Sequence, residues 1–578
     1  MSERATSESG TREAGTREAA TGDARVNVAA LLDAHAAAAP DRVAVRTARR
    51  GLPVRFDDES FAAVAARSRR IASGLLASGL APGDRVCLFV RPSADLIACT
   101  YGLLRAGLVP VLIDPGMGRR ALLACVERIQ PHALVGIARA HTAARLFHKS
   151  FASVRLRVVV GGRAHGSALT IEQVERAGTP DFTGCDTGPD DTAAILFTSG
   201  STGPPKGVVY THAIFAEQVR HLEALYGFEP GEVDVACFPL FALFDNALGM
   251  TSVFPAMDPS RPARCDPARI VGAIEASGAT SAFASPAVWR RVVPWCEARG
   301  IRLASLRRAL TAGAPIPPTL VERLVALMPD DGRAYTPYGA TECLPVANVS
   351  DRDILDPAAR AISDTGGGNL VGRLADDTDL RIVRITDDEV PRFDPADELG
   401  TGAIGEVWVR SGVATPAYAF DEAATRAAKV PTDEPGPGRG FYHRMGDLGY
   451  RDDAGRLWFC GRKGHRLRTP DGDVACVPLE NLFAGHPAVA RCAVVGVGAP
   501  GAQRAVLIVE RSRPSVLDRW RRRRPGLAEE IRAHGRQRSA RADLISEVLF
   551  HRRFPVDPRH NAKIHREELR AWAEGVLR

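Results

Sequence analysis

One ten-residue stretch decides how the rest of the chain is interpreted: Thr198-Ser199-Gly200-Ser201-Thr202-Gly203-Pro204-Pro205-Lys206-Gly207. It follows a strand-like run from Ala193 to Phe197. A strand that opens into glycines and hydroxyl side chains can wrap backbone N–H groups around phosphate oxygens, and Lys206 adds a positive charge. The stretch is not a Walker loop, because Gly207 stands where that motif has the Ser or Thr that holds magnesium. It predicts a phosphate-binding loop of another type.

The sequence on both sides of this loop alternates between two hydrophobic periods. Residues Phe61 to Leu80 have the period of a helix, and short apolar runs typical of buried strands lie at Val86 to Val90, Val109 to Ile113, Ala133 to Ile137 and Leu156 to Val160. Strands that alternate with helices at this spacing indicate parallel sheets covered by helices. We therefore expect an α/β fold for the large N-terminal part, residues 26–462.

A smaller domain is expected after the basic, glycine-bearing turn from Gly461 to Gly464, and we place it at residues 463–578. Its predicted elements are strands at Cys492 to Val497 and Ala505 to Val509, and helices at Asp543 to Phe550 and Arg566 to Leu577. Mixed elements of this kind predict a small α+β domain. A glycine-rich stretch within it, Gly496 to Gly501, satisfies a dinucleotide fingerprint, but a strand-like run follows where a helix should start, so we reject a Rossmann site.

Two segments differ from the rest in composition. Residues 1–25 are rich in Ser, Thr, Glu, Arg and Gly and repeat Gly-Thr-Arg-Glu-Ala, a composition that predicts a disordered tail. The stretch from about 511 to 541 is arginine-rich and includes Arg521 to Arg524. We favour a solvated insertion here over a docking surface for an acidic partner. With no nucleic-acid module in the sequence, we expect no nucleic-acid binding.

Overall composition is that of a globular protein: 578 residues, 45% hydrophobic, 25% charged, with a net charge of +7. We find no apolar run near the roughly 18 residues needed to cross a bilayer, and Glu3 and Glu8 stand where a signal peptide would be basic. We therefore expect a cytoplasmic protein that is not integral to a membrane. The 11 cysteines occur singly, without zinc spacing, and predict neither a disulfide framework nor a structural metal.

The ten-residue loop resembles the signature loop of the adenylate-forming superfamily, and further motifs of that family follow in its order. The resemblance implies that Thr198, Ser199, Gly200, Ser201, Thr202, Gly203 and Lys206 hold the phosphates of ATP. Ala312-Gly313-Ala314-Pro315 resembles the segment that lines the adenine pocket, so Gly313, Ala314 and Pro315 are expected to bind ATP. Tyr335 to Glu342 resembles the family's aromatic-Gly-x-Thr-Glu motif. By this resemblance Tyr338 and Gly339 adjoin adenine, Thr341 contacts the α-phosphate, and Glu342 helps hold Mg²⁺.

Three later motifs extend the resemblance to the C-terminus. Met445-Gly446-Asp447-Leu448 resembles the family's Thr-Gly-Asp-Leu, which implies that Asp447 accepts hydrogen bonds from the ribose. Arg462 matches the arginine near the ribose, but Gly464 replaces the usual hinge aspartate or lysine. Lys563 stands where the family has its C-terminal catalytic lysine, which would steady the charge that builds on the α-phosphate. The implied cofactors are ATP and Mg²⁺, with Lys563, Thr341, Glu342 and Lys206 as catalytic residues and a mobile C-terminal domain.

Three stretches resemble one branch of this superfamily, the olefin β-lactone synthetases: Phe238 to Asp245, Met257 to Pro262, and Leu549 to Lys563. Aromatic residues of the first stretch, Phe241 and Phe244, could line an alkyl channel or belong to an ordinary core. This branch implies that a 2-alkyl-3-hydroxy fatty acid is adenylated and that its own hydroxyl closes a β-lactone. It also implies an assembly with other enzymes of hydrocarbon biosynthesis.

Two points stay open at the level of sequence. A long-chain acyl-CoA or acyl-carrier ligase would share the adenylation motifs, so the second step is not fixed by them. The base that takes the hydroxyl proton is also unassigned, with His212, His221 and His551 as candidates by residue type. A non-catalytic protein with this fold is disfavoured, because Lys563, Glu342 and Asp447 are all present.

Overall fold

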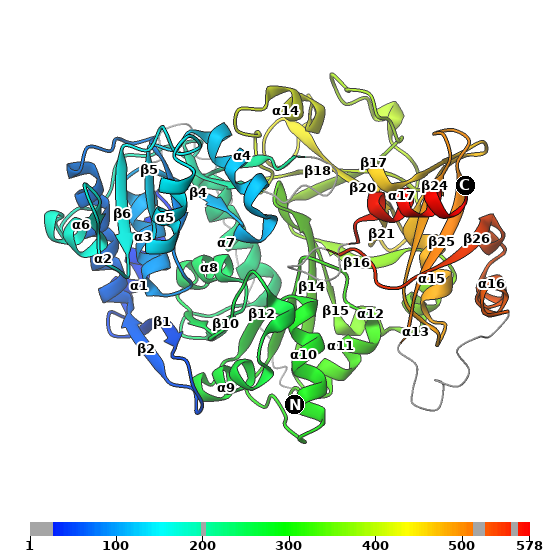
Figure 1. Ribbon diagram of the computed structural model, residues 1–578, viewed down its shortest axis with the longest axis horizontal. Coiled ribbons are helices and arrows are strands. Elements are labelled where there is room, and N and C mark those ends of the chain that lie inside the picture. The colour runs from blue at the N-terminus through cyan, green and yellow to red at the C-terminus, as the bar shows by residue number, and fades with distance from the viewer. Residues whose placement is uncertain (1–26, 198–203, 513–525, 557–563) are drawn as a thin grey trace, which may run out of the picture.

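Five of the seven strands of the first sheet in the computed structural model are the apolar runs that the sequence predicts as strands, and the two edge strands were not predicted (Figure 1). The structure describes residues 27–197, 204–512, 526–556 and 564–578. The strand order is β7-β6-β5-β3-β4-β8-β9, and all neighbours are parallel except β8 and β9. These strands are β3 (Arg85–Phe89), β4 (Val109–Ile113), β5 (Ala133–Ile137), β6 (Leu156–Val160), β7 (Leu169–Thr170), β8 (Thr192–Phe197) and β9 (Gly207–Thr211).

Helices connect these strands because a parallel pair needs a crossover. α2 begins after Ser60, whose hydroxyl accepts a hydrogen bond from the Ala63 N–H, and buries Ile71 and Leu75. The helices of this part are α1 (Ala29–Ala38), α2 (Phe61–Ala77), α3 (Ala94–Arg105), α4 (Arg119–Ile129), α5 (Ala138–Leu146) and α6 (Ile171–Ala177). Helices over a buried parallel sheet confirm the predicted α/β class.

Strand pairing in the second sheet changes from parallel to antiparallel at the turn that contains predicted site residues. Strands β11-β10-β12-β13-β14 are parallel, and from β14 to β15 the pairing is antiparallel. The sheet comprises β1 (Val43–Ala48), β2 (Phe56–Ser60), β10 (Val233–Ala236), β11 (Thr251–Phe254), β12 (Ser281–Ala284), β13 (Arg308–Thr311), β14 (Arg333–Ala340), β15 (Cys343–Ser350), β16 (Asn369–Leu374), β17 (Thr378–Val383), β18 (Gly405–Ser411), β19 (Lys429–Pro431), β20 (Phe441–Arg451) and β21 (Leu457–Arg462). The tight turn between β14 and β15 contains Thr341 and Glu342.

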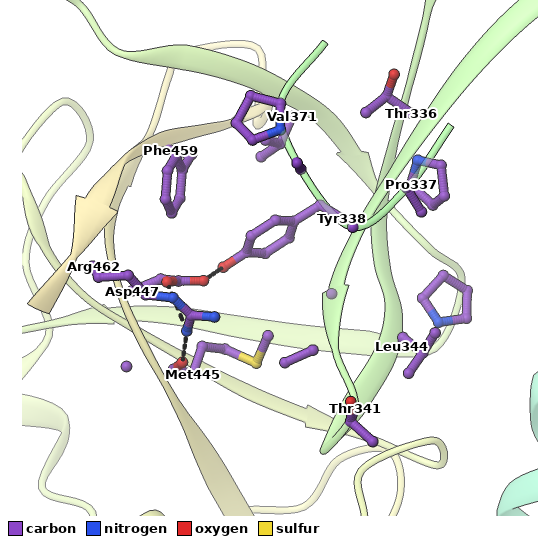
Figure 2. Close-up of a pocket in the computed structure, with 18 of the residues that line it drawn as sticks. Thr336, Pro337, Tyr338, Thr341, Leu344, Val371, Met445, Asp447, Phe459 and Arg462 are labelled. Carbon is purple, nitrogen blue, oxygen red and sulfur yellow. Dashed lines mark hydrogen bonds and ion pairs between the residues drawn. The ribbon is translucent and has the colours of Figure 1, made fainter. Parts of the chain in front are cut away.

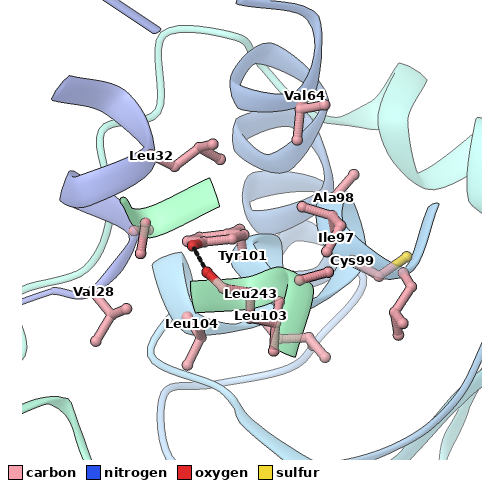
Figure 3. Close-up of a cluster of buried hydrophobic side chains, with 14 of the residues drawn as sticks. Val28, Leu32, Val64, Ile97, Ala98, Cys99, Tyr101, Leu103, Leu104 and Leu243 are labelled. Carbon is pink, nitrogen blue, oxygen red and sulfur yellow. Dashed lines mark hydrogen bonds between the residues drawn. The ribbon is translucent and has the colours of Figure 1, made fainter. Parts of the chain in front are cut away.

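The helices around the second sheet include α7 and α8, which carry phenylalanines of the cavity described below. They are α7 (His212–Tyr226), α8 (Ala242–Ala247), α9 (Pro267–Ser277), α10 (Pro286–Glu297), α11 (Pro318–Val325), α12 (Asp351–Leu355), α13 (Pro357–Asp364) and α14 (Glu422–Ala428). Figure 3 shows how α8 is fixed: the Tyr101 hydroxyl of α3 donates to the Leu243 carbonyl at 2.8 Å, among buried side chains that include Leu32 and Val64. Because Tyr101 is fully buried, this bond ties α8 to the helical layer of the first sheet.

The C-terminal part forms its own small layer at one end of the molecule (Figure 1). Its sheet has the order β24-β25-β26, with β24 (Val489–Val497) antiparallel and β26 (Ile545–His551) parallel to β25 (Arg504–Arg511). Leu507 is buried on one face and Ile508 on the other. The other elements are β22 (Leu467–Thr469), β23 (Gly472–Val474), α15 (Cys476–Ala484), α16 (Leu527–Arg538) and α17 (Arg566–Val576). A large α/β part and a small α+β part confirm the predicted fold class.

Two predictions for this region are wrong in part. Within the predicted helix Asp543 to Phe550, the residues from Ile545 onward form strand β26, because parallel pairing with β25 buries Ile545 and Val548. The stretch from 511 to 541 is not simply a solvated insertion, because α16 places Leu527 and Ile531 in the core. Arg521 to Arg524 and the predicted tail, 1–25, lie outside the described residues.

Two further expectations can be compared with the elements. At the glycine fingerprint the chain turns from β24 directly into β25, so no helix starts there and the rejection of a Rossmann site is confirmed. Among the described helices, none has the length and apolar character needed to cross a bilayer.

Candidate active site

A cavity of roughly 1850 Å³ lies where the second sheet, α7, α8 and the C-terminal part meet. Most of the residues that the sequence predicts for the site line it. They are Lys206, Phe241, Phe244, Gly313, Ala314, Pro315, Tyr338, Gly339, Thr341, Glu342, Asp447 and Arg462. The loop residues Thr198 to Gly203 and Lys563 lie outside the described residues, so the structure gives no position for them.

Tyr338, Asp447 and Arg462 form one polar group on the cavity wall (Figure 2). The Tyr338 hydroxyl donates to Asp447 Oδ2 at 2.7 Å, and Arg462 Nη1 lies 3.1 Å from Asp447 Oδ1. Arg462 also donates to the Met445 carbonyl at 3.1 Å. Burial, together with the neighbouring Asp447 carboxylate, raises the pKa of Tyr338 well above its usual value, so the phenol stays protonated as a donor. An aromatic ring beside a carboxylate suits a nucleoside, which offers a flat base and two hydroxyl donors.

The adjoining turn is held rigidly by hydrogen bonds from three directions. The Tyr210 hydroxyl donates to the Thr341 carbonyl at 2.6 Å, and the Thr415 N–H and hydroxyl both donate to the Glu342 carbonyl at 2.9 Å. The Tyr418 hydroxyl donates to Glu342 Oε1 at 2.8 Å. These bonds fix the backbone of the turn, and the Tyr418 bond also holds the Glu342 carboxylate.

Glu342 and Lys206 lie near the same aromatic side chain. Lys206 Nζ is 4.7 Å from the centre of the Tyr418 ring, whose hydroxyl bonds Glu342. Magnesium is commonly held by one or two carboxylates together with substrate phosphates. Among the described residues no cluster of three or more His, Cys, Asp or Glu could hold a metal. A single carboxylate near a lysine therefore fits a magnesium that is bound with a phosphate substrate.

Two buried residues beside this turn were not predicted from the sequence, Lys429 and His443. They are cross-strand partners on β19 and β20. Lys429 Nζ lies 3.4 Å from the Thr415 hydroxyl, and burial lowers the pKa of Lys429 to about 8. His443 lines the cavity, and its Nδ1 lies 3.2 Å from the Ala428 carbonyl. Nothing in the sequence marks Lys429. The one signal for His443 is that it precedes Met445 by two positions and Asp447 by four, and both of these residues also line the cavity.

The three histidines suggested as bases, His212, His221 and His551, do not line the cavity. His212 Nδ1 accepts the Val28 N–H at 3.3 Å, and His221 Nε2 lies 3.3 Å from the Glu217 carboxylate on the same helix. His551 packs edge-on against Trp572 in the C-terminal part. These contacts occupy all three in the scaffold, and the histidines of the described cavity wall are His443 and His465.

The start of the C-terminal part is tied to the second sheet by a buried ion cluster. Glu406 receives two hydrogen bonds from Arg444, at 3.1 and 2.9 Å, and Lys463 Nζ lies 2.9 Å from Glu406 Oε1. The Glu406 side chain is 1% exposed and that of Arg444 5%. Gly464, which replaces the expected hinge residue, follows directly and also lines the cavity.

Aromatic rings cover the apolar side of the cavity, and we call Phe215, Phe238, Phe241, Phe244 and Phe283 the aromatic wall. Phe215 stacks on Phe244 with ring centres 4.7 Å apart, and Phe241 stacks on Phe283 at 4.2 Å. All five line the cavity. They come from α7, α8, β12 and the turn before α8, so the Tyr101 bond to Leu243 helps fix the wall.

Comparison with known proteins decides the family. The family model described as "AMP-binding enzyme" matches residues 32–419. This protein is a member of the AMP-binding enzyme family. It is 42% identical to the olefin beta-lactone synthetase of Xanthomonas campestris pv. campestris over 560 residues, which cover 95% of this chain and 97% of the relative. It is also 42% identical to the olefin beta-lactone synthetase of Stenotrophomonas maltophilia over 559 residues, 95% of this chain and 98% of the relative.

The fold of this AMP-binding enzyme is also found in solved structures. ATP-bound MatB from Rhodopseudomonas palustris superposes with a TM-score of 0.76 at 21% identity, over 96% of this chain and all of that one. Membership confirms two predictions: the chain is an acid-activating ligase, and its cofactor is ATP. The cavity that contains the family's predicted motif residues is therefore the candidate active site.

Proposed function

We propose that this AMP-binding enzyme converts a long-chain 2-alkyl-3-hydroxy acid into a β-lactone, consuming ATP and releasing AMP and pyrophosphate. The observation that carries the proposal is the identity of 42% with an olefin beta-lactone synthetase along nearly the whole of both chains. Because the match spans 95% of this chain, it takes in the C-terminal part as well as the large N-terminal part.

The first step makes the carboxylate a better electrophile by removing its charge. One carboxylate oxygen attacks the α-phosphate of ATP, and pyrophosphate departs. Lys206 would attract the departing phosphates, Thr341 and Lys563 would stabilise the α-phosphate, and Asp447 would hold the ribose. Glu342 would hold magnesium, which when bound supplies positive charge to the phosphates. The fixed backbone of the Thr341–Glu342 turn and the bond from the Tyr418 hydroxyl to the Glu342 carboxylate support these roles.

In the second step the substrate supplies its own nucleophile. The 3-hydroxyl attacks the acyl carbonyl, a four-membered ring closes, and AMP leaves. An intramolecular attack needs no second substrate, and a well-oriented pose can give it a large effective molarity. The aromatic wall supports a substrate with long alkyl chains, because its five phenylalanines offer an apolar surface along which such chains can lie.

Neighbouring reactions follow from this chemistry. A β-hydroxy acid with a 2-alkyl branch must be supplied by an enzyme that joins two acyl chains and reduces the product, and the lactone must be consumed or retained. We propose that the protein works beside such enzymes, in an assembly or in sequence.

A turnover assay tests the proposal. Purified protein is given ATP, Mg²⁺ and either the 3-hydroxy acid or its 3-deoxy analogue, without coenzyme A, and the pyrophosphate released is counted per enzyme. The proposal predicts many turnovers with the hydroxy acid but about one pyrophosphate per enzyme with the deoxy acid, whose adenylate has no internal nucleophile and stays bound. Equal release of about one pyrophosphate per enzyme from both acids, followed by turnover when coenzyme A is added, would instead identify an acyl-CoA ligase.

A further inference from the structure

Ring closure needs a base, because an alcohol becomes a competent nucleophile only as its proton leaves. His212, His221 and His551 are excluded as bases by their positions away from the cavity. In the part of the chain that the structure describes, two histidines line the cavity, His443 and His465. His465 lies in the short 3-10 helix at Lys463–His465, which follows Arg462 at the start of the C-terminal part.

His443 stands on β20, four residues before Asp447, the carboxylate proposed for the ribose, and both residues line the cavity. Lys206 and Arg462 are both close enough to His443 to repel a proton from its ring. The reacting carbonyl must lie beside the α-phosphate, between the phosphate end, which Lys206 marks, and the ribose end, which Arg462 marks. Arg462 acts electrostatically on both histidines, but Lys206 acts only on His443, so His443 lies nearer the phosphate end than His465.

The hydrogen bond of His443 fixes which ring nitrogen is basic. A carbonyl oxygen only accepts, so the contact of 3.2 Å requires that Nδ1 carry the proton and donate to Ala428. In the neutral ring Nε2 then has the free electron pair. The His443 side chain is 2% exposed and has Lys429 as its cross-strand partner. The resulting site is a tautomer-locked imidazole at the cavity wall, the arrangement of a general base.

Electrostatics supports a neutral ring before the reaction. Burial and repulsion from Lys429 hold the pKa of His443 well below its usual value, with smaller contributions from Lys206 and Arg462. The phosphate of a bound acyl-adenylate would offset these positive charges and raise the basicity of the ring when it is needed. The ring would thus be a weaker base in the free enzyme and a stronger base in the adenylate complex, where ring closure needs it.

We infer that His443 is the general base of ring closure, an inference that rests on the proposed function. The O–H bond of the 3-hydroxyl breaks and its proton passes to Nε2 of His443. The oxygen forms a bond to the acyl carbon, and the bond between that carbon and the AMP oxygen breaks, so AMP leaves with the electron pair. His443 then returns the proton to solvent when the lactone leaves.

Two variants separate this role from a structural one. His443→Asn retains an amide N–H near the position of Nδ1, for the Ala428 carbonyl, and removes Nε2, whereas His443→Gln places an amide near Nε2 that is not basic. ATP–pyrophosphate exchange measures adenylation, and lactone formation measures both steps. We expect exchange within a few-fold of wild type, which also shows that each variant is folded, and lactone formation lower by about 10²-fold or more.

A variant that lacks the imidazole ring and a matched control complete the test. In His443→Ala, added imidazole should partly restore lactone formation. His551→Gln, a change of the same type outside the cavity, should leave both rates unaltered. The inference is wrong if the His443 variants form lactone at the wild-type rate, or if exchange and lactone formation fall by the same factor. If wild-type protein adenylates the acid but makes no lactone, the proposed function fails instead, and the two failures are distinguishable.

Discussion

Replacing Glu406 by glutamine should destabilise the protein by about 3 kcal/mol. Its carboxylate receives two hydrogen bonds from Arg444 and one contact from Lys463, and its side chain is 1% exposed. Removing one partner of a buried ion pair typically costs about 3–5 kcal/mol, because the other charge is left uncompensated. The lower end applies here, since Arg444 retains bonds to the Thr386 and Asp388 carbonyls at 2.7 and 2.9 Å. At about 1.4 kcal/mol per factor of ten, this loss is roughly 100-fold in the unfolding equilibrium.

Urea denaturation followed by tryptophan fluorescence measures this loss. Trp408 is 1% exposed and lies 5.4 Å from the Arg444 guanidinium, so it reports on the cluster directly. Glu398→Gln is the matched control: its carboxylate pairs with Arg381 at 2.8 Å, but both side chains are 30% exposed. A pair with that exposure contributes about 1 kcal/mol or less. If Glu406→Gln loses no more free energy of unfolding than Glu398→Gln, the buried cluster does not stabilise this junction as described.

Three further predictions concern the cavity and the core. Asp447→Asn should raise the KM for ATP about 30-fold in pyrophosphate exchange, because two hydrogen bonds to a carboxylate become bonds to a neutral amide, each weaker by about 1 kcal/mol. An unchanged KM would contradict the role of Asp447 at the ribose. Phe244→Ala should shift the preferred acid toward longer chains, because it opens space for added methylene groups. Each buried CH₂ contributes about 0.8 kcal/mol, which corresponds to an increase of up to about fourfold in kcat/KM. An unaltered preference among competing acids would show that Phe244 does not contact the alkyl chain. Burial raises the pKa of Asp234 to about 7, so stability from its retained proton is full below about pH 4 and is lost as the pH rises through 7. Thermal melts should therefore show the melting temperature of Asp234→Asn rising relative to that of wild type from pH 4 to pH 8. A difference in melting temperature that stays constant over this range would contradict the raised pKa.

The sequence predicted the fold best where burial is uniform along an element. The strands of the first sheet are short apolar runs such as Val109–Ile113, and a parallel sheet that is buried on both faces requires that composition. Asp543–Phe550 failed because its apolar residues fit a helix as well as a strand, and only pairing with β25 decides between them. The domain boundary placed between Arg462 and Lys463 stays a prediction.

The site was predictable where motifs lie at strand ends and hidden where long-range pairing matters. Tyr338 and Asp447, 109 residues apart, meet through a hydrogen bond because their motifs lie on β14 and β20. His443 and Lys429 were missed because their significance depends on burial and on cross-strand pairing, which no local pattern records. The roles of Lys563 and of Thr198 to Gly203 stay predictions, since those residues lie outside the described part of the chain.

Product identification by proton NMR tests the central claim most directly. Purified protein is incubated with ATP, Mg²⁺ and a synthetic 2-alkyl-3-hydroxy fatty acid, with and without coenzyme A, and Lys563→Ala serves as the inactive comparison. The account predicts the ring protons of a β-lactone in the absence of coenzyme A and none with Lys563→Ala. A thioester that forms only when coenzyme A is present, with no lactone under either condition, would contradict it.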